Sequence, residues 1–304
     1  MMLSNKGDDI MKKNKSKRNK NSAFDIVIIV ILALFSICCL YPFINILLTS
    51  FSTEADYLNS NILVIPRHFN IESYRYIFLE GGMLKSFGIS GLVSICGVIY
   101  SMLLTSLGAY VLSKKRLPGQ KIFFTMILIT MFFGGGIIPF FFVLKSLKLY
   151  NSLLGLFIPF GISSYNMIVL RNFFVSVPDE VIESAKLDGA SDFTILTRIV
   201  VPLSKAGFAT IMLFYFVGFY NDWYWPMILI QNEDLYPLSL KLRNILSNAQ
   251  AADYYKQINV DSGLLYSKGQ DSASIIVSLI PILVIYPFVQ KYFVKGVMLG
   301  SVKS

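Results

Sequence analysis

Two polar groups of residues stand out in the second half of the chain because they interrupt runs of apolar side chains. The first group covers 183–202 and reads ESAKLDGASDFTILTRIVVP, and its Glu183 offers a carboxylate to a basic partner. The second group lies inside an apolar run and consists of Tyr220, Asn221, Asp222, Trp223 and Trp225. Aromatic faces and hydrogen-bonding groups in an apolar wall are the side chains that hold a small polar ligand such as a sugar.

The motifs of common enzymes are missing from the sequence. There is no G-x-x-x-x-G-K-[ST] phosphate-binding loop, no G-x-S-x-G and no H-E-x-x-H. Asp222 is the only carboxylate well inside an apolar run, and the single histidine, His68, has no cluster of metal ligands around it. Cys38, Cys39 and Cys96 fall within apolar runs without metal-like spacing. We therefore expect no catalytic residue, no metal site and no cofactor in this chain.

The composition of the chain is unusually apolar. Of its 304 residues, 55% are hydrophobic and 15% charged, and the mean hydropathy is +0.61. These values exclude a soluble domain of ordinary composition. A bilayer core about 30 Å thick requires roughly 20 apolar residues for each spanning helix. We therefore predict an all-α, polytopic membrane domain over 24–304 with six transmembrane helices, near 25–48, 86–112, 122–144, 151–170, 206–230 and 272–291.

The positive charges predict how this domain lies in the membrane. A basic tail at 1–23, with the segment MKKNKSKRNK, stands before the first apolar run. In the six-span topology, Lys and Arg are about twice as frequent on the side that holds both termini, and such an excess marks the cytoplasmic side. We therefore predict cytoplasmic termini and a cytoplasmic loop at 171–205. Because the tail lacks aromatic residues and nucleic-acid motifs, the net charge of +9 indicates orientation and no nucleic-acid partner.

The predicted cytoplasmic loop carries its own helix signals. Ser176 and Asp179 have the S-x-x-D spacing of a capping box, and Pro178 suits a first helical turn. We therefore expect a helix to begin near Val177. It should end just before Gly189, because glycine readily adopts the left-handed conformation that follows a helix end.

A second short helix is predicted after this turn. Ser191 or Asp192 can cap it, and Pro202 can close it. Its apolar stripe at helical spacing consists of Phe193, Leu196, Ile199 and Val200. The residues alone leave two interpretations open. Either the helix pair covers the end of the bundle, or it docks in a groove of a cytoplasmic partner and transmits movement.

The spacing of this block resembles the EAA loop of ABC importer permeases. That pattern is E-A-A, three residues, G, nine residues, and then I-x-L-P. The matching positions are Glu183, Ser184, Ala185, Gly189, Ile199 and Pro202. Ser184 stands in place of the first alanine, and Val201 stands in place of the leucine. Both departures are conservative, and the spacing over the whole pattern is intact.

Other segments extend the resemblance over nearly the whole chain after the basic tail. KKRLPGQK, NDWYWP and KYFVKGVMLGSVKS are similar to the carbohydrate-uptake branch of these permeases. YPFINILLTSFS, IPRHFNIESYRYIF, FGGGIIPFFFVLKSL and RNFFVSVPDE are similar to permeases for complex sugars or aldouronate oligosaccharides. The resemblance therefore implies an oligosaccharide as cargo, with uronate-containing sugars as candidates.

The resemblance also implies a complex in the bacterial cytoplasmic membrane. Its other members are a second, non-identical permease subunit, two ATPase subunits that bind ATP and Mg²⁺, and an extracytoplasmic solute-binding protein. ATP then drives alternation between inward-facing and outward-facing states, so this chain is expected to be a transport subunit and not an enzyme. The residues assigned to ATPase coupling are Glu183, Ser184, Ala185, Asp188, Gly189, Ala190, Ile199 and Pro202.

The cluster at 220–225 is the candidate substrate path. Its tryptophans equally suit an aromatic belt at the membrane interface, and its polar residues equally suit bonds to neighbouring helices. Lys145 and Lys148, at the outer end of the third span, are the candidate partners for a uronate carboxylate. The glycines at 134–136, followed by Pro139, interrupt the third span and either open backbone groups to a cavity or allow close packing. The alternative function is an ion-driven secondary transporter that uses Asp222 as its proton or sodium site.

Overall fold

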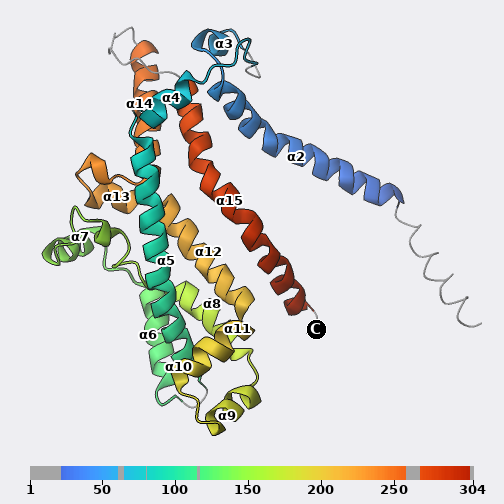
Figure 1. Ribbon diagram of the computed structural model, residues 1–304, viewed down its shortest axis with the longest axis vertical. Helices are drawn as coiled ribbons and strands as arrows, with labels where there is room; N and C mark the ends of the chain where they lie inside the picture. Colours follow the sequence, from blue (N-terminus) through green and yellow to red (C-terminus); the bar gives the residue numbers. More distant parts are fainter. Residues whose placement is uncertain (1–21, 61–64, 80, 115–116, 258–267, 302–304) are drawn as a thin grey trace, which may run out of the picture.

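The computed structural model describes residues 22–60, 65–79, 81–114, 117–257 and 268–301 (Figure 1). These ranges contain helices and no β-strand, in agreement with the predicted all-α fold. The predicted basic tail at 1–23 lies outside them except for its last two residues. The longer helices are α2 (Ser22–Ser50), α5 (Met83–Ser113), α12 (Lys205–Asn221), α14 (Leu238–Gln257) and α15 (Lys268–Ser301).

Shorter helices lie in the segments between these longer helices. On the N-terminal side they are α3 (Glu54–Leu58), α4 (Glu72–Leu79), α6 (Gln120–Phe132), α7 (Ile137–Ser146), the 3-10 turn η2 (Leu153–Leu156) and α8 (Ser164–Val175). On the C-terminal side they are α9 (Asp179–Leu187), α10 (Asp192–Ile195), the π-helical turn η3 (Leu196–Val200), α11 (Val201–Leu203), α13 (Tyr224–Leu229) and the 3-10 turn η4 (Glu233–Leu235).

Three of the described helices are long and apolar enough to cross a membrane. They are Phe24–Ser50, Met83–Ser113 and Lys268–Pro287, which correspond to the first, second and sixth predicted spans. Two bent helix pairs pass the same test when each pair is taken together, and they raise the number to five. The count of six spans therefore stays a prediction.

The third predicted span, 122–144, is broken in the middle. α6 and α7 meet there at an angle of 109°. Gly136 lies at the break with a φ of +82°, a conformation that glycine adopts without the steric cost of a Cβ. The predicted interruption at 134–136 is therefore confirmed, and a continuous helix over this range is excluded.

The fourth predicted span, 151–170, is not a continuous helix. It holds only η2 and the first residues of α8. The stretch GLFIPFG at 155–161 is apolar, yet its two glycines and its proline disfavour a helix interior. Mean hydropathy therefore marked this range as a span, although its local sequence prevents a single helix.

The fifth predicted span, 206–230, also contains a break. α12 ends at Asn221, Asp222 is extended, and α13 begins at Tyr224. A second bend of 92° precedes α12, at Ser204. The polar cluster predicted inside this span therefore lies at a helix end and not along a continuous helix.

The core lies where α5, α8 and α12 contact one another, and α5 runs through most of the length of the molecule (Figure 1). The hydroxyl groups of Thr105 and Tyr215 are 2.7 Å apart in this core. The Tyr215 oxygen also accepts a hydrogen bond from the Ser163 backbone N–H at 2.9 Å. One tyrosine therefore joins α5, α12 and the start of α8 while its polar group stays satisfied.

α2 contacts α15 at one end and leans away from the rest of the bundle (Figure 1). No residue in its spanning window is buried. Cys38 and Cys39 on α2, and Cys96 on α5, are free and exposed. An apolar stretch of this length whose side chains are all exposed requires lipid or another apolar subunit around it.

The packing of α12 against α8 gives a stability prediction at Gly207. A Cβ atom at this position would come within 2.2 Å of Cγ of Phe173, so the ring or the helix would have to move. We expect Gly207→Ala to destabilise the protein by about 1–3 kcal/mol, the usual cost of overpacking. The measurement is the thermal unfolding midpoint of the purified complex. Gly218→Ala on the same helix is the matched control, because a Cβ there meets no atom within 4 Å; equal midpoints for both variants would contradict the prediction.

Candidate functional site

The polar block lies at the end of the molecule remote from α14, with α9 at the tip (Figure 1). It consists of α9, a turn at Gly189, and a helical run from Asp192 to Leu203 that includes α10, η3 and α11. The predicted order of helix, turn and helix is therefore found. The first residues of the predicted loop at 171–205 belong to α8, which continues to Val175.

The start of α9 differs from the prediction. Pro178 is the residue that precedes the helix, and no side chain caps its N-terminus. The Ser176 hydroxyl donates instead to the backbone oxygen of Phe173, at the end of α8. The capping box of Ser176 and Asp179 is therefore wrong, and the helix begins at Asp179 and not near Val177. The reason is that α8 extends to Val175 and takes Ser176 as its own C-terminal residue.

The end of α9 agrees with the prediction. Gly189 has a φ of +80°, and the backbone N–H of Ala190 donates to the oxygen of Ala185 at 3.0 Å. The N–H of Gly189 donates to the oxygen of Lys186, also at 3.0 Å. These two bonds are the Schellman pattern that ends a helix through a left-handed residue. The turn is therefore defined by backbone geometry, and Gly189 is the residue that it requires.

The second helix is capped as predicted but buries a different face. The Ser191 hydroxyl accepts from the N–H of Thr194. Leu196 and Val200 are buried as expected, whereas Phe193 is 63% exposed and Ile195 is fully buried in its place. Pro202 does not close the helix, because α11 continues to Leu203. The predicted stripe is thus wrong at Phe193, because the packing against α5 and α8 selects a neighbouring face.

The block is attached to α5 by polar contacts. Nζ of Lys114 lies 2.7 Å from Oδ2 of Asp192, and the Tyr110 hydroxyl donates to Oδ1 of the same carboxylate at 3.1 Å. The Lys114 ammonium holds the pKa of Asp192 below its ordinary value. Nε of Arg171 donates to the backbone oxygen of Leu112 at 3.0 Å, which joins α8 to the same end of α5. A force applied to α10 can therefore reach the end of a long core helix.

Several α9 residues are exposed, and Glu183 among them lines a groove between α9 and the end of α5. Glu183 is exposed, and no described cation lies within ion-pair distance of its carboxylate. Leu187, in the last turn, is 89% exposed, and Asp188 and Gly189 after it are exposed as well. Ala185 and Ala190 instead pack against the core. The predicted coupling residues therefore divide into an inner group, Ala185, Ala190 and Ile199, that packs against the core, and an exposed group that includes Glu183, Asp188 and Gly189.

Leu187 was missed by the sequence interpretation. It follows Lys186 and precedes Asp188 in a polar segment, so no periodic apolar pattern marked it. The available signal was a leucine in the last turn of a short helix of mostly polar residues, which also exposes Val181. An apolar side chain exposed at a protruding tip can serve as a contact for a protein partner.

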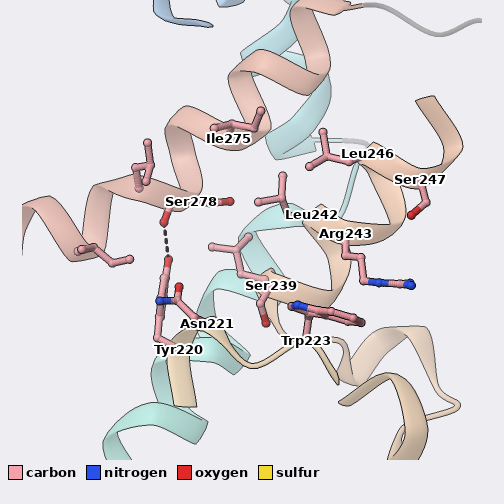
Figure 2. Close-up of a pocket in the computed structure, with 13 residues that line it drawn as sticks. Tyr220, Asn221, Trp223, Ser239, Leu242, Arg243, Leu246, Ser247, Ile275 and Ser278 are labelled. Atoms are coloured by element: carbon pink, nitrogen blue, oxygen red, sulfur yellow. Dashed lines mark hydrogen bonds between the residues drawn. The ribbon is translucent and has the colours of Figure 1, made fainter. Parts of the chain in front are cut away.

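At the other end of the molecule, a cavity of about 450 Å³ lies between the end of α12, α14 and α15 (Figure 2). Tyr220, Asn221 and Trp223 of the predicted substrate path line it. The Tyr220 hydroxyl donates to the backbone oxygen of Ser278 on α15 at 3.0 Å. The volume of this cavity is in the range of known small-molecule binding sites.

Two other predicted substrate-path residues lie outside this cavity. The Trp225 ring packs against Phe140 and Phe160, with ring centroids 5.1 and 5.2 Å apart, so it joins α13 to α7 in an aromatic cluster. Lys145 is exposed on α7, with its ammonium 5.9 Å from the Tyr150 ring. The structure therefore does not group Trp225 or Lys145 with Tyr220, Asn221 and Trp223.

Asp222 has a structural role at the break between α12 and α13. Its Oδ1 accepts hydrogen bonds from the backbone N–H groups of Tyr224 at 3.0 Å and Trp225 at 3.3 Å. A carboxylate at this position satisfies the free N–H groups that begin a helix and interacts favourably with the helix dipole. The carboxylate does not line the cavity.

This geometry gives a prediction for Asp222. We expect Asp222→Ala to lower stability by about 0.5–2 kcal/mol, the typical cost of a lost N-terminal cap. Asp222→Asn should cost less, because the amide oxygen can accept the same bonds. Thermal unfolding of both variants, with uptake by the asparagine variant, measures this. An asparagine variant that folds normally yet has lost all uptake would instead make the carboxylate an ion site.

The sequence interpretation also missed the α14 side of the cavity. Ser239, Arg243 and Ser247 come from this helix, which lies in a stretch treated as an external loop. The guanidinium carbon of Arg243 is 4.5 Å from the centroid of the Trp223 ring. The serines and the arginine stand at intervals of four residues, a helical spacing that could have indicated a polar face toward the cluster.

The match to a protein-family description covers almost the whole chain. Residues 10–299 match the family described as "Binding-protein-dependent transport system inner membrane component". The chain belongs to this family. The permease accordingly shares its helical membrane architecture with proteins that act as the membrane subunits of ABC transporters.

Individual relatives match the permease along their whole length. YtcP of Bacillus subtilis strain 168, a "Polygalacturonan/rhamnogalacturonan transport system permease protein", is 38% identical over 297 residues, which is 94% of this chain and 100% of the relative. Protein LplC of the same strain is 35% identical and is covered to 95%. A chain in the crystal structure of a bacterial ABC transporter "involved in the import of the acidic polysaccharide alginate" is 31% identical. The two folds superpose with a TM-score of 0.80 over 90% of this permease and 98% of that chain.

Proposed function

We propose that this permease is one membrane subunit of an ATP-driven, binding-protein-dependent importer that passes oligosaccharides across the bacterial cytoplasmic membrane. The observation that carries the proposal is the polar block at the tip, in which Glu183 has no ion-pair partner among the described residues and Leu187 is exposed. Such a surface requires a partner, and the EAA spacing points to a soluble ATPase as that partner. The named cargoes of YtcP and of the alginate importer support a complex sugar, including a uronate-containing one, as the substrate.

In this proposal the block transmits movement from the ATPase to the membrane helices. Glu183 pairs with a basic group of the ATPase, and Leu187 enters an apolar pocket on the same surface. The turn at Gly189 keeps α9 at a fixed angle to α10, and the Lys114–Asp192 ion pair connects α10 to α5. Closure of the ATPase subunits therefore moves the end of α5 and with it the bundle core.

The proposed complex supplies what this chain lacks. ATP and Mg²⁺ bind to the two ATPase subunits, because the permease has no phosphate-binding loop. A second, non-identical permease subunit completes the pathway, and an extracytoplasmic solute-binding protein delivers the sugar. Both termini lie in the cytoplasm, as the distribution of Lys and Arg indicates.

Uptake into proteoliposomes that contain the complete complex tests this proposal. With ATP inside and the loaded binding protein outside, sugar should accumulate, and an ionophore that removes ion gradients should leave the rate unchanged. Vesicles with a non-hydrolysable ATP analogue are the control. Uptake that continues without ATP and stops with the ionophore would overturn the proposal.

A further inference from the structure

Among the described residues that line the cavity at the end of α12, Arg243 is the charged one (Figure 2). Its guanidinium group lies over the Trp223 ring. No described carboxylate lies within ion-pair distance of it. The cavity therefore contains a half-buried positive charge without a described anionic partner.

The stacking fixes the direction of this charge. A guanidinium group over an indole ring is attracted by the electrons of the ring and keeps its N–H groups free around its edge. Those N–H groups form a planar fork that matches a carboxylate in a bidentate manner. The Trp223 side chain is itself 40% exposed, so part of its surface stays available to a ligand.

Asp222, the acidic residue that precedes Trp223 in sequence, is engaged by other groups. Asp222 directs Oδ1 to the first N–H groups of α13, and it does not line the cavity. The Ser239 hydroxyl binds the backbone oxygen of Asp222, which holds α14 against the break. The local structure thus uses the Asp222 carboxylate elsewhere and leaves the Arg243 guanidinium for a ligand.

Polar groups suited to sugar hydroxyls line the same cavity. Asn221 and Ser247 line the same cavity as Arg243, and Ser247 lies one helical turn after it on α14 (Figure 2). Most of the lining otherwise comes from apolar side chains such as Leu242, Leu246 and Ile275. This combination of a cation, an aromatic face and a few hydrogen-bonding groups fits an acidic sugar better than a neutral lipid or a free metal ion.

We propose that this cavity binds a carboxylate-bearing sugar unit, with Arg243 pairing with the carboxylate while Trp223 packs against the ring. The inference rests on the proposed function, because it assumes that sugar reaches this end of the molecule, and it makes Arg243 the residue that selects acidic cargo. Lys145 and Lys148, the basic residues expected from sequence, are separate from this site.

The test measures binding of trigalacturonate to the purified complete importer, without ATP, by equilibrium dialysis. The fully methyl-esterified trisaccharide is the second probe, because it keeps the shape and removes the charge. Loss of a charge-assisted hydrogen-bonded pair predicts about 10- to 100-fold weaker binding of trigalacturonate to Arg243→Gln. Arg243→Lys keeps the charge but loses the fork, so it should be intermediate. Binding of the ester should change by less than about threefold.

Arg75→Gln is the matched control, because Arg75 lies outside the cavity, 69% exposed and paired with Glu72. It should leave the affinities for both probes unchanged. If Arg243→Gln does not fold, the affinity of Arg243→Lys for trigalacturonate is compared with that of the unchanged complex. Weaker binding by Arg243→Lys then supports the inference, and equal binding overturns it. Three results would each overturn the inference: no binding of trigalacturonate by the unchanged complex, unaltered binding by the Arg243 variants, or equal losses for both probes. Failure of this inference can be distinguished from failure of the proposed function. A complex that binds trigalacturonate through Arg243 but shows no ATP-driven uptake would support the inference and contradict the proposed function.

Discussion

Glu183→Arg is expected to abolish ATP-driven uptake while leaving the permease folded. Glu183 is exposed on the rim of the groove between α9 and the end of α5, and its carboxylate has no hydrogen bond or ion pair with a described residue, so the substitution removes no described contact. Reversing its charge against a basic group of the ATPase costs about 2–5 kcal/mol at a desolvated interface, which is sufficient to prevent productive docking. The measurement is the uptake rate in proteoliposomes together with the thermal unfolding midpoint of the permease.

The matched control for this charge reversal is Glu72→Arg on α4. Glu72 is also exposed, but it lies at the other end of the molecule from α9 (Figure 1). We expect normal uptake for Glu72→Arg and a graded loss for Glu183→Gln, which removes the charge without reversing it. Full uptake by Glu183→Arg would show that this carboxylate plays no part in coupling.

Leu187→Glu is expected to release the ATPase subunits from the membrane complex. Full burial of a leucine side chain contributes about 1.5–3 kcal/mol, and a charge in the same apolar pocket adds a desolvation penalty. The ATPase should therefore bind about 10- to 100-fold more weakly, or weaker still. Co-purification of the ATPase with tagged permease, followed by titration of free ATPase, measures the change.

Leu79→Glu provides the comparison for Leu187. Leu79 is similarly exposed, at 72%, and ends α4 on the opposite side of the molecule (Figure 1). It should leave binding of the ATPase unaltered. Equal weakening by both substitutions would indicate a general effect of charge on the complex, and the role of Leu187 as an anchor would be refuted.

The polar block was predictable from sequence where its structure depends on neighbouring residues alone. The left-handed turn at Gly189 and the cap at Ser191 depend on a few neighbouring residues, and both were found as expected. The start of α9 depends on where α8 ends, so the same reasoning failed at Ser176. The buried face of the second helix was wrong at Phe193, because packing against α5 and α8 decides it.

The spans and the cavity were less predictable, because tertiary structure defines them. Hydropathy located α2, α5 and α15, whose apolar runs have no break. It could not distinguish a straight helix from the bent elements at 122–144 or the irregular segment at 151–170. Arg243 is twenty residues from Trp223 in sequence and meets it only because α14 packs beside the end of α12.

The central claim is that α9 is the surface on which the ATPase acts, and photo-cross-linking tests it most directly. The photoreactive residue is introduced as Ser184→benzoylphenylalanine, because Ser184 is exposed and one helical turn before Leu187. Irradiation of the complete complex should give a covalent adduct between the permease and an ATPase subunit, whereas the same residue in place of Leu79 should give none. An intact complex that forms no ATPase adduct from position 184, or the same adduct from both positions, would contradict the account.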